Sequence, residues 1–350
     1  MIKKLFSLIF TTLLLFFVST AAAQTPLCTN LKVTTLPAPG DYGSAGRFAV
    51  ARQSINNPEP GAPDSVSVYL PENASAQTRV PVIFFAHGFG GTDFRYYDEL
   101  SRQIASNGYA VVFAPYTANL LTSHPVRYQQ MWAGFQAAAQ QFGNVLDTTR
   151  VGFAGHSYGA GAVPELARRA VAAGWGANGL FIFSMAPWYS WGTNYEQIPA
   201  STKLIVQVYW DDETNQHLIG VNDVWNRLPQ ITEKRWQVIR AAQTTCLLSA
   251  GHGVPVTGNR DKPEEINAYD YWGVWRKLHA LADYTFTGNS RAKFVAFDDT
   301  QMGKWRFYAL RAVKPLETTT TPIVNSEINP DFIWASRCLF SLGSPCSIGN

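Results

Sequence analysis

Residues 155–159 of this chain read Gly-His-Ser-Tyr-Gly, which matches the G-x-S-x-G pattern of catalytic serines. The pattern requires a sharp turn between a buried strand and a helix, and its glycines leave room for that turn. An apolar run at 150–154 precedes the motif, and a helical pattern follows it to about residue 173. We therefore predict that Ser157 is a nucleophile. The alternative is a glycine-rich turn whose serine only caps the helix.

A serine hydroxyl becomes a good nucleophile when a base accepts its proton, and this motif takes its acid and then its histidine from later in the chain. His252 lies within Ala-Gly-His-Gly at 250–253, directly after an apolar strand-like run at 244–249. We predict that His252 is the base, against the alternative of a loop histidine with a structural hydrogen bond. The other five histidines fit this role less well by their position along the chain: His87, His124, His156, His217 and His279.

The acid that orients this histidine is expected after an earlier strand. The apolar run at 203–209 is followed by Trp-Asp-Asp-Glu at 210–213, which places three carboxylates together. Asp212 is our first choice and Asp211 the second. The remaining acids are expected to lie in a solvated turn or at the start of a helix.

Acyl transfer also needs two backbone N–H groups that stabilise the oxyanion. One is expected from Tyr158, directly after the nucleophile, and the other from the loop after the first buried strand. That loop reads Ala-His-Gly-Phe-Gly-Gly at 86–91, and Phe89 is the expected donor. The alternative is a glycine-rich connection without a catalytic role.

The elements that position these residues alternate between strand and helix, which predicts an α/β fold with a mostly parallel central sheet and helices on both faces. The expected strands are apolar or alternating runs, at 47–52, 65–70, 80–86, 109–114, 150–154, 179–185, 203–209 and 244–249. The expected helices lie at 95–106, 125–142, 158–173, 218–227 and 264–282. Because active sites on such sheets lie at the carboxyl ends of the strands, the motifs above should meet there.

The first 23 residues are predicted to be a secretory signal peptide. Lys3 and Lys4 precede an apolar run from Leu5 to Val18, and alanines at 21–23 supply a small-residue cleavage pattern. An uncleaved membrane anchor is the alternative, although a bilayer span needs roughly 20 residues. We assign residues 24–290 to one catalytic domain and 291–350 to an irregular extension packed on it.

Composition and cysteine content fit an exported globular protein. Removal of the signal would lower Lys+Arg from 28 to 26 against 25 acidic residues, which gives no reason to expect nucleic acid or an anionic membrane as a partner. Four cysteines remain, an even number that suggests two disulfides in an oxidising compartment. The short spacing favours Cys338 with Cys346 and leaves Cys28 with Cys246, but three pairings and free buried thiols stay open.

With these motifs in place, the chain resembles the cutinase and poly(ethylene terephthalate) hydrolase group of dienelactone-hydrolase-like α/β-hydrolases, over about residues 80–281. The resemblance implies the α/β-hydrolase fold, an aromatic Phe89 that lines the cleft, and Asp212 and His252 as acid and base. Ala-Pro-Trp at 186–188 is similar to a family motif whose tryptophan, here Trp188, forms the opposite wall of the cleft. It also implies a C-terminal disulfide between Cys338 and Cys346. The sequence departs from the group at Thr-Asn-Gln-His, 214–217, and in its longer tail.

We therefore expect a secreted, monomeric serine esterase that needs no metal or organic cofactor and has no membrane span after signal removal. Its triad would be Ser157, His252 and Asp212, and Phe89, Tyr158 and Trp188 would bind a carboxylic ester, with a polyester among the candidate substrates. A lipase or small-ester esterase is the alternative within this class. A non-catalytic binding protein on a hydrolase scaffold is the alternative outside it.

Overall fold

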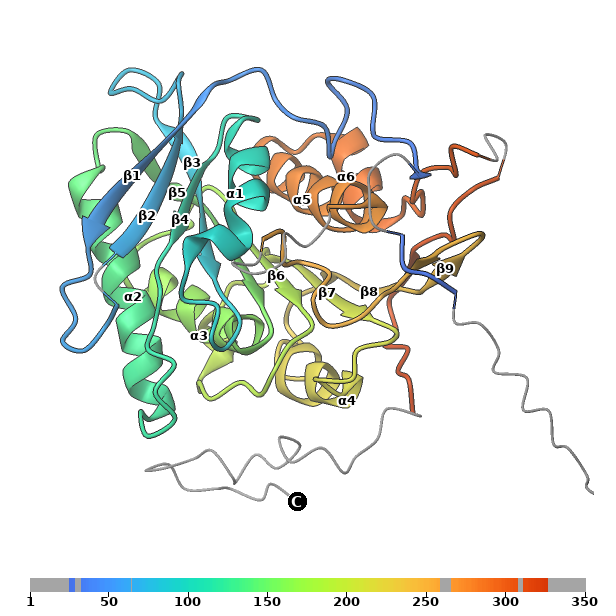
Figure 1. The fold of residues 1–350 in the computed structure, drawn as a ribbon. Helices are drawn as coiled ribbons and strands as arrows, with labels where there is room; N and C mark the ends of the chain where they lie inside the picture. The colour runs from blue at the N-terminus through green and yellow to red at the C-terminus, as the bar shows by residue number, and fades with distance from the viewer. Residues whose placement is uncertain (1–24, 29–32, 64, 259–265, 308–310, 327–350) are drawn as a thin grey trace, which may run out of the picture.

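The computed structural model describes residues 25–28, 33–63, 65–258, 266–307 and 311–326, and its centre is a nine-stranded sheet (Figure 1). The strand order is β1-β2-β4-β3-β5-β6-β7-β8-β11. Strands β3 to β8 run parallel, whereas β2 is antiparallel to both of its neighbours and β11 is antiparallel to β8. This confirms the predicted α/β class with a mostly parallel sheet.

The strands of this sheet are β1 Val50–Asn56, β2 Ser65–Pro71, β3 Val80–Ala86, β4 Ala110–Phe113, β5 Leu146–His156, β6 Leu180–Met185, β7 Lys203–Tyr209, β8 Glu233–Ile239 and β11 Glu317–Thr319. Every residue of β3, β4 and β6 is buried. Their uninterrupted apolar sequences suit strands that are covered on both faces.

Helices cover both faces of the sheet (Figure 1). They are α1 Asp98–Ala105, α2 His124–Gln141, α3 Tyr158–Ala172, α4 His217–Gly220, α5 Arg276–Thr287 and α6 Ser290–Phe297. Successive side chains of β3 point to opposite faces, as strand geometry requires. Ile83 and Phe85 pack with the cluster that includes α1, α5 and α6, and Val82 and Phe84 pack with the cluster that includes α2 and α3. No helix in the described part of the chain is long and apolar enough to cross a membrane.

One predicted strand is wrong. The run at 244–249 does not join the central sheet, because only Leu247–Leu248 (β10) is a strand and it pairs with Ala242–Gln243 (β9) in a separate two-stranded sheet. The strand that follows β7 in the sheet is β8, which the sequence analysis missed. Its first three residues are Glu, Lys and Arg and are only partly buried, so β8 lacks the uniform apolar pattern of the other strands.

The segment after residue 290 is more regular than expected. Helix α6 packs on α5, and β11 extends the sheet beyond β8. Further along, Trp236 Nε1 donates a hydrogen bond to the carbonyl of Ile323, 2.8 Å away. The described part of this segment therefore contributes a helix and a strand, and the prediction of an irregular tail was wrong for residues 291–297 and 317–319.

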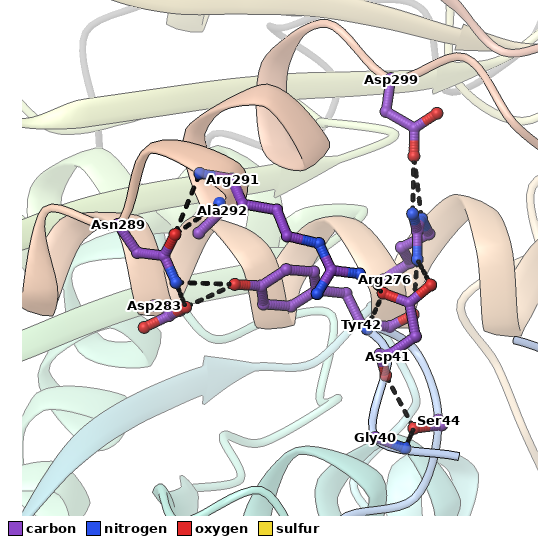
Figure 2. Close-up of polar contacts among 10 residues, drawn as sticks. All are labelled: Gly40, Asp41, Tyr42, Ser44, Arg276, Asp283, Asn289, Arg291, Ala292 and Asp299. Atoms are coloured by element: carbon purple, nitrogen blue, oxygen red, sulfur yellow. Dashed lines mark hydrogen bonds and ion pairs between the residues drawn. The ribbon is translucent and has the colours of Figure 1, made fainter. Parts of the chain in front are cut away.

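The loop before β1 is held to α5 and α6 by a polar network (Figure 2). Arg276 forms ion pairs with Asp41 at 3.1 Å and with Asp299 at 2.9 Å. Arg291 also contacts Asp41, at 2.8 Å. Tyr42 donates a hydrogen bond to Asp283, 2.5 Å away. These contacts attach an otherwise irregular N-terminal segment to the helical layer.

A disulfide joins Cys28 to Cys246, across a sequence separation of 218 residues. The bridge connects the N-terminal segment to the loop between β9 and β10, as expected for this pair. The predicted signal peptide at 1–23 and the predicted pairing of Cys338 with Cys346 lie outside the described residues.

Candidate active site

Ser157 occupies the turn between β5 and α3 with a strained backbone conformation. Its φ is 55° and its ψ is −119°, a region that residues with a side chain rarely adopt. The turn is held by neighbouring backbone: Ser157 N donates to Met185 O at 2.9 Å, and its own carbonyl accepts from Trp188 N at 2.9 Å. Ser157 therefore lies at the carboxyl end of β5, the edge of the sheet where the active site was expected.

The glycines around Ser157 are required by close backbone contacts. A Cβ on Gly155 would lie 2.6 Å from the carbonyl carbon of Gly159, and a Cβ on Gly159 would lie 2.1 Å from the carbonyl oxygen of Ala86. Gly161, outside the motif, is equally constrained, since its Cβ would lie 2.4 Å from the carbonyl oxygen of Trp188. Together these three glycines allow α3 to pack directly against the end of β3 and the loop that carries Trp188.

His252 and Asp212 are in direct contact. Nδ1 of His252 lies 2.8 Å from Oδ2 of Asp212. The other carboxylate oxygen of Asp212 accepts the backbone N–H groups of Thr214 at 2.8 Å and Asn215 at 2.9 Å, so the carboxylate is held in one orientation. Because Asp212 occupies Nδ1, the remaining ring nitrogen of His252 is Nε2, the atom that a serine base would use.

Asp211, the second choice for the acid, points elsewhere. Its carboxylate accepts the backbone N–H of Ala250 at 3.3 Å, and its backbone N–H donates to the Ala250 carbonyl at 3.0 Å. Asp211 therefore joins the loop before His252 to the end of β7, whereas Asp212 contacts the imidazole itself. The sequence could not distinguish these roles, because both residues follow the same strand.

A buried histidine inside the serine motif supports the loop of His252. His156 Nε2 lies 2.9 Å from the His252 carbonyl, and His156 Nδ1 lies 2.9 Å from the Tyr97 hydroxyl. A carbonyl can only accept, so Nε2 carries the proton and Nδ1 accepts from Tyr97. Burial, together with the proximity of the His252 imidazole, lowers the pKa of His156 well below its ordinary value. His156 is therefore a neutral positioning residue.

Phe89 and Tyr158, the predicted oxyanion donors, line the same pocket as the serine. Tyr158 is the first residue of α3, so its N–H has no carbonyl acceptor within the helix. Gly88, next to Phe89, approaches the serine closely, because a Cβ there would lie 3.3 Å from Ser157 Cβ. Gly88 N donates to the Tyr97 hydroxyl at 3.0 Å, which holds this loop in place.

Ser157 and His252 line the same pocket, of about 250 Å³. Phe89, Tyr158 and Trp188 line it as well, so the structure brings together every predicted site residue except Asp212, which lies behind His252. The Phe89 side chain is 44% exposed and Leu120 is 52% exposed, which places apolar surface at the edge of the pocket. Such a pocket suits an apolar ligand that is oriented by a few polar groups.

Several pocket residues were missed by the sequence analysis. Asn215 Nδ2 donates to the Ala186 carbonyl at 2.7 Å and lies 3.5 Å from Ser157 Oγ. His124, dismissed because it precedes the serine, stacks on Trp191 at 3.9 Å and contacts the Tyr158 hydroxyl at 2.9 Å. Arg127 follows it in α2. The sequence pattern could have indicated that Arg127 is buried. It lies four residues before Met131, on the face of α2 that carries buried apolar residues, and a charged residue on such a face is unusual.

The remaining three histidines lie outside the pocket of Ser157. His87 Nε2 accepts the Tyr116 N–H at 3.1 Å, and burial lowers its pKa to about 4. His217 is bonded to the Tyr209 carbonyl and to Asn325 N. Burial also lowers the pKa of His279 to about 4. None of these three lines the pocket that holds Ser157 and His252.

The arrangement as a whole combines a strained serine, an oriented imidazole and helix N–H groups at one pocket. Serine-based acyl transfer uses these kinds of group: a hydroxyl, a base for its proton and donors that stabilise negative charge. No protein-family model matches the chain, and no curated protein matches it.

Proposed function

We propose that this protein is a serine esterase that hydrolyses carboxylic esters through an acyl-enzyme. The observation that carries the proposal is that strained Ser157 shares a pocket with His252, whose Nδ1 is held by Asp212 at 2.8 Å. A buried aspartate that holds one imidazole nitrogen leaves the other as a general base, which is the arrangement of serine hydrolases on several folds.

The proposed fold is that of the α/β-hydrolases. Two observations support this assignment: only β2 runs antiparallel within the order β1 to β8, and the serine lies on a turn from β5 into α3. The acid follows β7 and the histidine follows β8 along the chain, in the order expected for this fold. The resemblance to the cutinase group points to the same assignment.

In the first half of the proposed reaction, His252 Nε2 accepts the proton of Ser157 as Oγ attacks the ester carbonyl. Asp212 stabilises the imidazolium that forms and does not take up the proton. The N–H groups of Tyr158 and Phe89 donate to the oxyanion of the tetrahedral intermediate. The intermediate collapses as His252 returns the proton to the alcohol, which leaves an ester between Ser157 and the acyl group.

In the second half, a water molecule attacks the acyl-enzyme while His252 accepts its proton. The oxyanion is stabilised by the same two N–H groups, and His252 then protonates Ser157 as the acid is released. Every proton transfer is made by one imidazole, so the reaction is complete with this chain's own residues.

The pocket favours esters with an apolar acyl or aryl part. Phe89, Leu120 and Trp188 give it apolar and aromatic walls. A cutinase-like activity on polyesters is the substrate class that the family resemblance adds. We also propose export of the protein, because the Cys28–Cys246 disulfide would persist in an oxidising compartment.

Hydrolysis of p-nitrophenyl butyrate by the wild type and by Ser157→Ala tests the proposal. We expect the wild type to release p-nitrophenol and the variant to lose at least about a thousandfold in kcat, because the acyl-enzyme cannot form. Labelling by a neutral fluorophosphonate, followed by mass spectrometry, should place one adduct on Ser157.

Equal and negligible rates for both proteins, with no adduct, would overturn the proposal and favour a non-catalytic binding protein. For an active wild type, p-nitrophenyl esters of increasing acyl length, together with a solid polyester film, separate the substrate classes. Activity on short esters alone would exclude the polyesterase assignment.

A further inference from the structure

Arg127 is a buried cation that lines the pocket of Ser157. It lies in the first turn of α2 and is only 2% exposed, yet its side chain forms part of the pocket wall. Arginine is almost never fully buried unless it is paired. The feature therefore needs an explanation beyond packing.

The contacts of the Arg127 guanidinium are with neutral groups. Nη2 donates to the Asn119 carbonyl at 2.7 Å, and Nε donates to the Thr117 carbonyl at 3.3 Å. Its central carbon lies 5.2 Å from the ring centre of Phe89 and 5.5 Å from that of Tyr158. The two carbonyls use two of the five N–H groups and place the cation beside both proposed oxyanion residues.

No carboxylate neutralises this cation within the described residues, where Arg127 takes part in no ion pair. None of the ten described residues that line the pocket is acidic. Asp212, the acid beside the pocket, is held by His252 and by two backbone N–H groups. A buried charge without a counter-charge is costly, and a ligand in the pocket could supply the charge that the described residues do not.

We infer that Arg127 binds a carboxylate carried by the substrate, so that the preferred esters are half-esters of dicarboxylic acids. This inference rests on the proposed esterase function and names its substrate class. A planar guanidinium can bind a carboxylate by paired, charge-assisted hydrogen bonds. The aromatic walls would then hold the carbon chain between the carboxylate and the ester carbonyl. Arg127 is thus a specificity-determining residue and takes no part in proton transfer.

Two esters of the same shape but different charge test the inference. p-Nitrophenyl hydrogen glutarate carries a carboxylate at the end of its acyl chain, and p-nitrophenyl 5-methylhexanoate replaces that carboxylate by an isopropyl group. We expect the wild type to have the higher kcat/KM for the glutarate, with most of the difference in KM.

Arg127→Gln should lower kcat/KM for the glutarate by roughly 10- to 100-fold more than kcat/KM for the neutral ester, the loss expected for a charge-assisted hydrogen bond. Arg127→Lys should retain part of the preference because it keeps the charge. Arg47→Gln, which removes an exposed arginine outside the pocket, is the matched control and should leave both rates unchanged. Equal losses on both esters in Arg127→Gln, or a wild type without preference for the glutarate, would overturn the inference.

A binding measurement separates this inference from failure of the esterase proposal. Ser157→Ala should bind monomethyl glutarate in calorimetry, and Ser157→Ala with Arg127→Gln should not. Binding that depends on Arg127 would support the carboxylate site even if the wild type hydrolyses neither ester. Equal binding, or none by either protein, would overturn it.

Discussion

The ring of His156 donates a hydrogen bond to the backbone carbonyl of His252, 2.9 Å away. The same ring accepts from Tyr97, whose hydroxyl also accepts the N–H of Gly88. One buried chain of hydrogen bonds therefore joins the loop of the proposed base to the loop of a proposed oxyanion donor. Its members come from three separate parts of the sequence, and each occupies a fixed position relative to Ser157.

Tyr97→Phe removes the hydroxyl at the centre of this chain. It leaves the Gly88 N–H and His156 Nδ1 buried without a partner, which costs about 1–3 kcal/mol for each group. We expect a lower unfolding temperature and a lower kcat with little change in KM, measured by calorimetry and p-nitrophenyl butyrate hydrolysis. Tyr96→Phe is the neighbouring control. A wild-type kcat in Tyr97→Phe would show that the two loops do not depend on this hydroxyl.

Asp212→Asn should reduce kcat strongly. An amide keeps the shape of the side chain but no longer stabilises the imidazolium, and in a well-studied serine protease the same change costs about 10⁴ in kcat. Asp211→Asn, one residue earlier, contacts Ala250 rather than the imidazole and should change kcat little. Steady-state kinetics of the two variants compare these neighbours directly. A larger loss in Asp211→Asn would reverse the assignment of the acid.

Removal of the disulfide should destabilise the protein. The double variant Cys28→Ser with Cys246→Ser removes the covalent link between the N-terminal segment and the β9–β10 loop, and loss of a native disulfide typically costs 2–5 kcal/mol. Urea unfolding without reductant should give a lower midpoint for the variant. Reductant should lower the wild-type midpoint toward that of the variant, whereas identical midpoints before reduction would contradict a stabilising bridge.

Lys277 should make stability depend on pH in the neutral to alkaline range. Its side chain is fully buried beside Arg276 and Asp299 (the pair drawn in Figure 2), and it donates to the carbonyls of Val295 and Asp299. Burial lowers the pKa of Lys277 to about 7, from an ordinary value of 10.5. Between these values the unfolded chain binds more protons than the folded protein, so the free energy of unfolding rises with pH.

Lys277→Met removes this contribution. We expect its stability relative to the wild type to fall as pH rises from about 7 to 10, by up to about 1.4 kcal/mol for each pH unit. Urea unfolding of both proteins at several pH values measures the difference, and below about pH 7 the difference should become constant. A difference that does not vary with pH would show that Lys277 keeps its ordinary pKa.

Features that depend on local sequence could be predicted. Strands β3 and β7 match their expected bounds, 80–86 and 203–209. A continuous apolar run of this length is typical of a strand that is buried at the centre of a sheet. The turn at 155–159 could also be predicted, because its glycines, the strand before it and the helix after it lie within about 25 consecutive residues. Strand β8 was missed because partial exposure of its first residues allows charged side chains there.

By itself, the sequence determined the alternation of strands and helices, the turn that carries Ser157 and the short list of candidate acids and bases. Only the tertiary structure decided that Asp212 rather than Asp211 meets His252, that His156 and Tyr97 join two loops, and that buried Arg127 faces the pocket of Ser157. The physical reason is that side-chain direction after a strand, and contacts between residues far apart in the chain, depend on how the whole sheet and its helices pack.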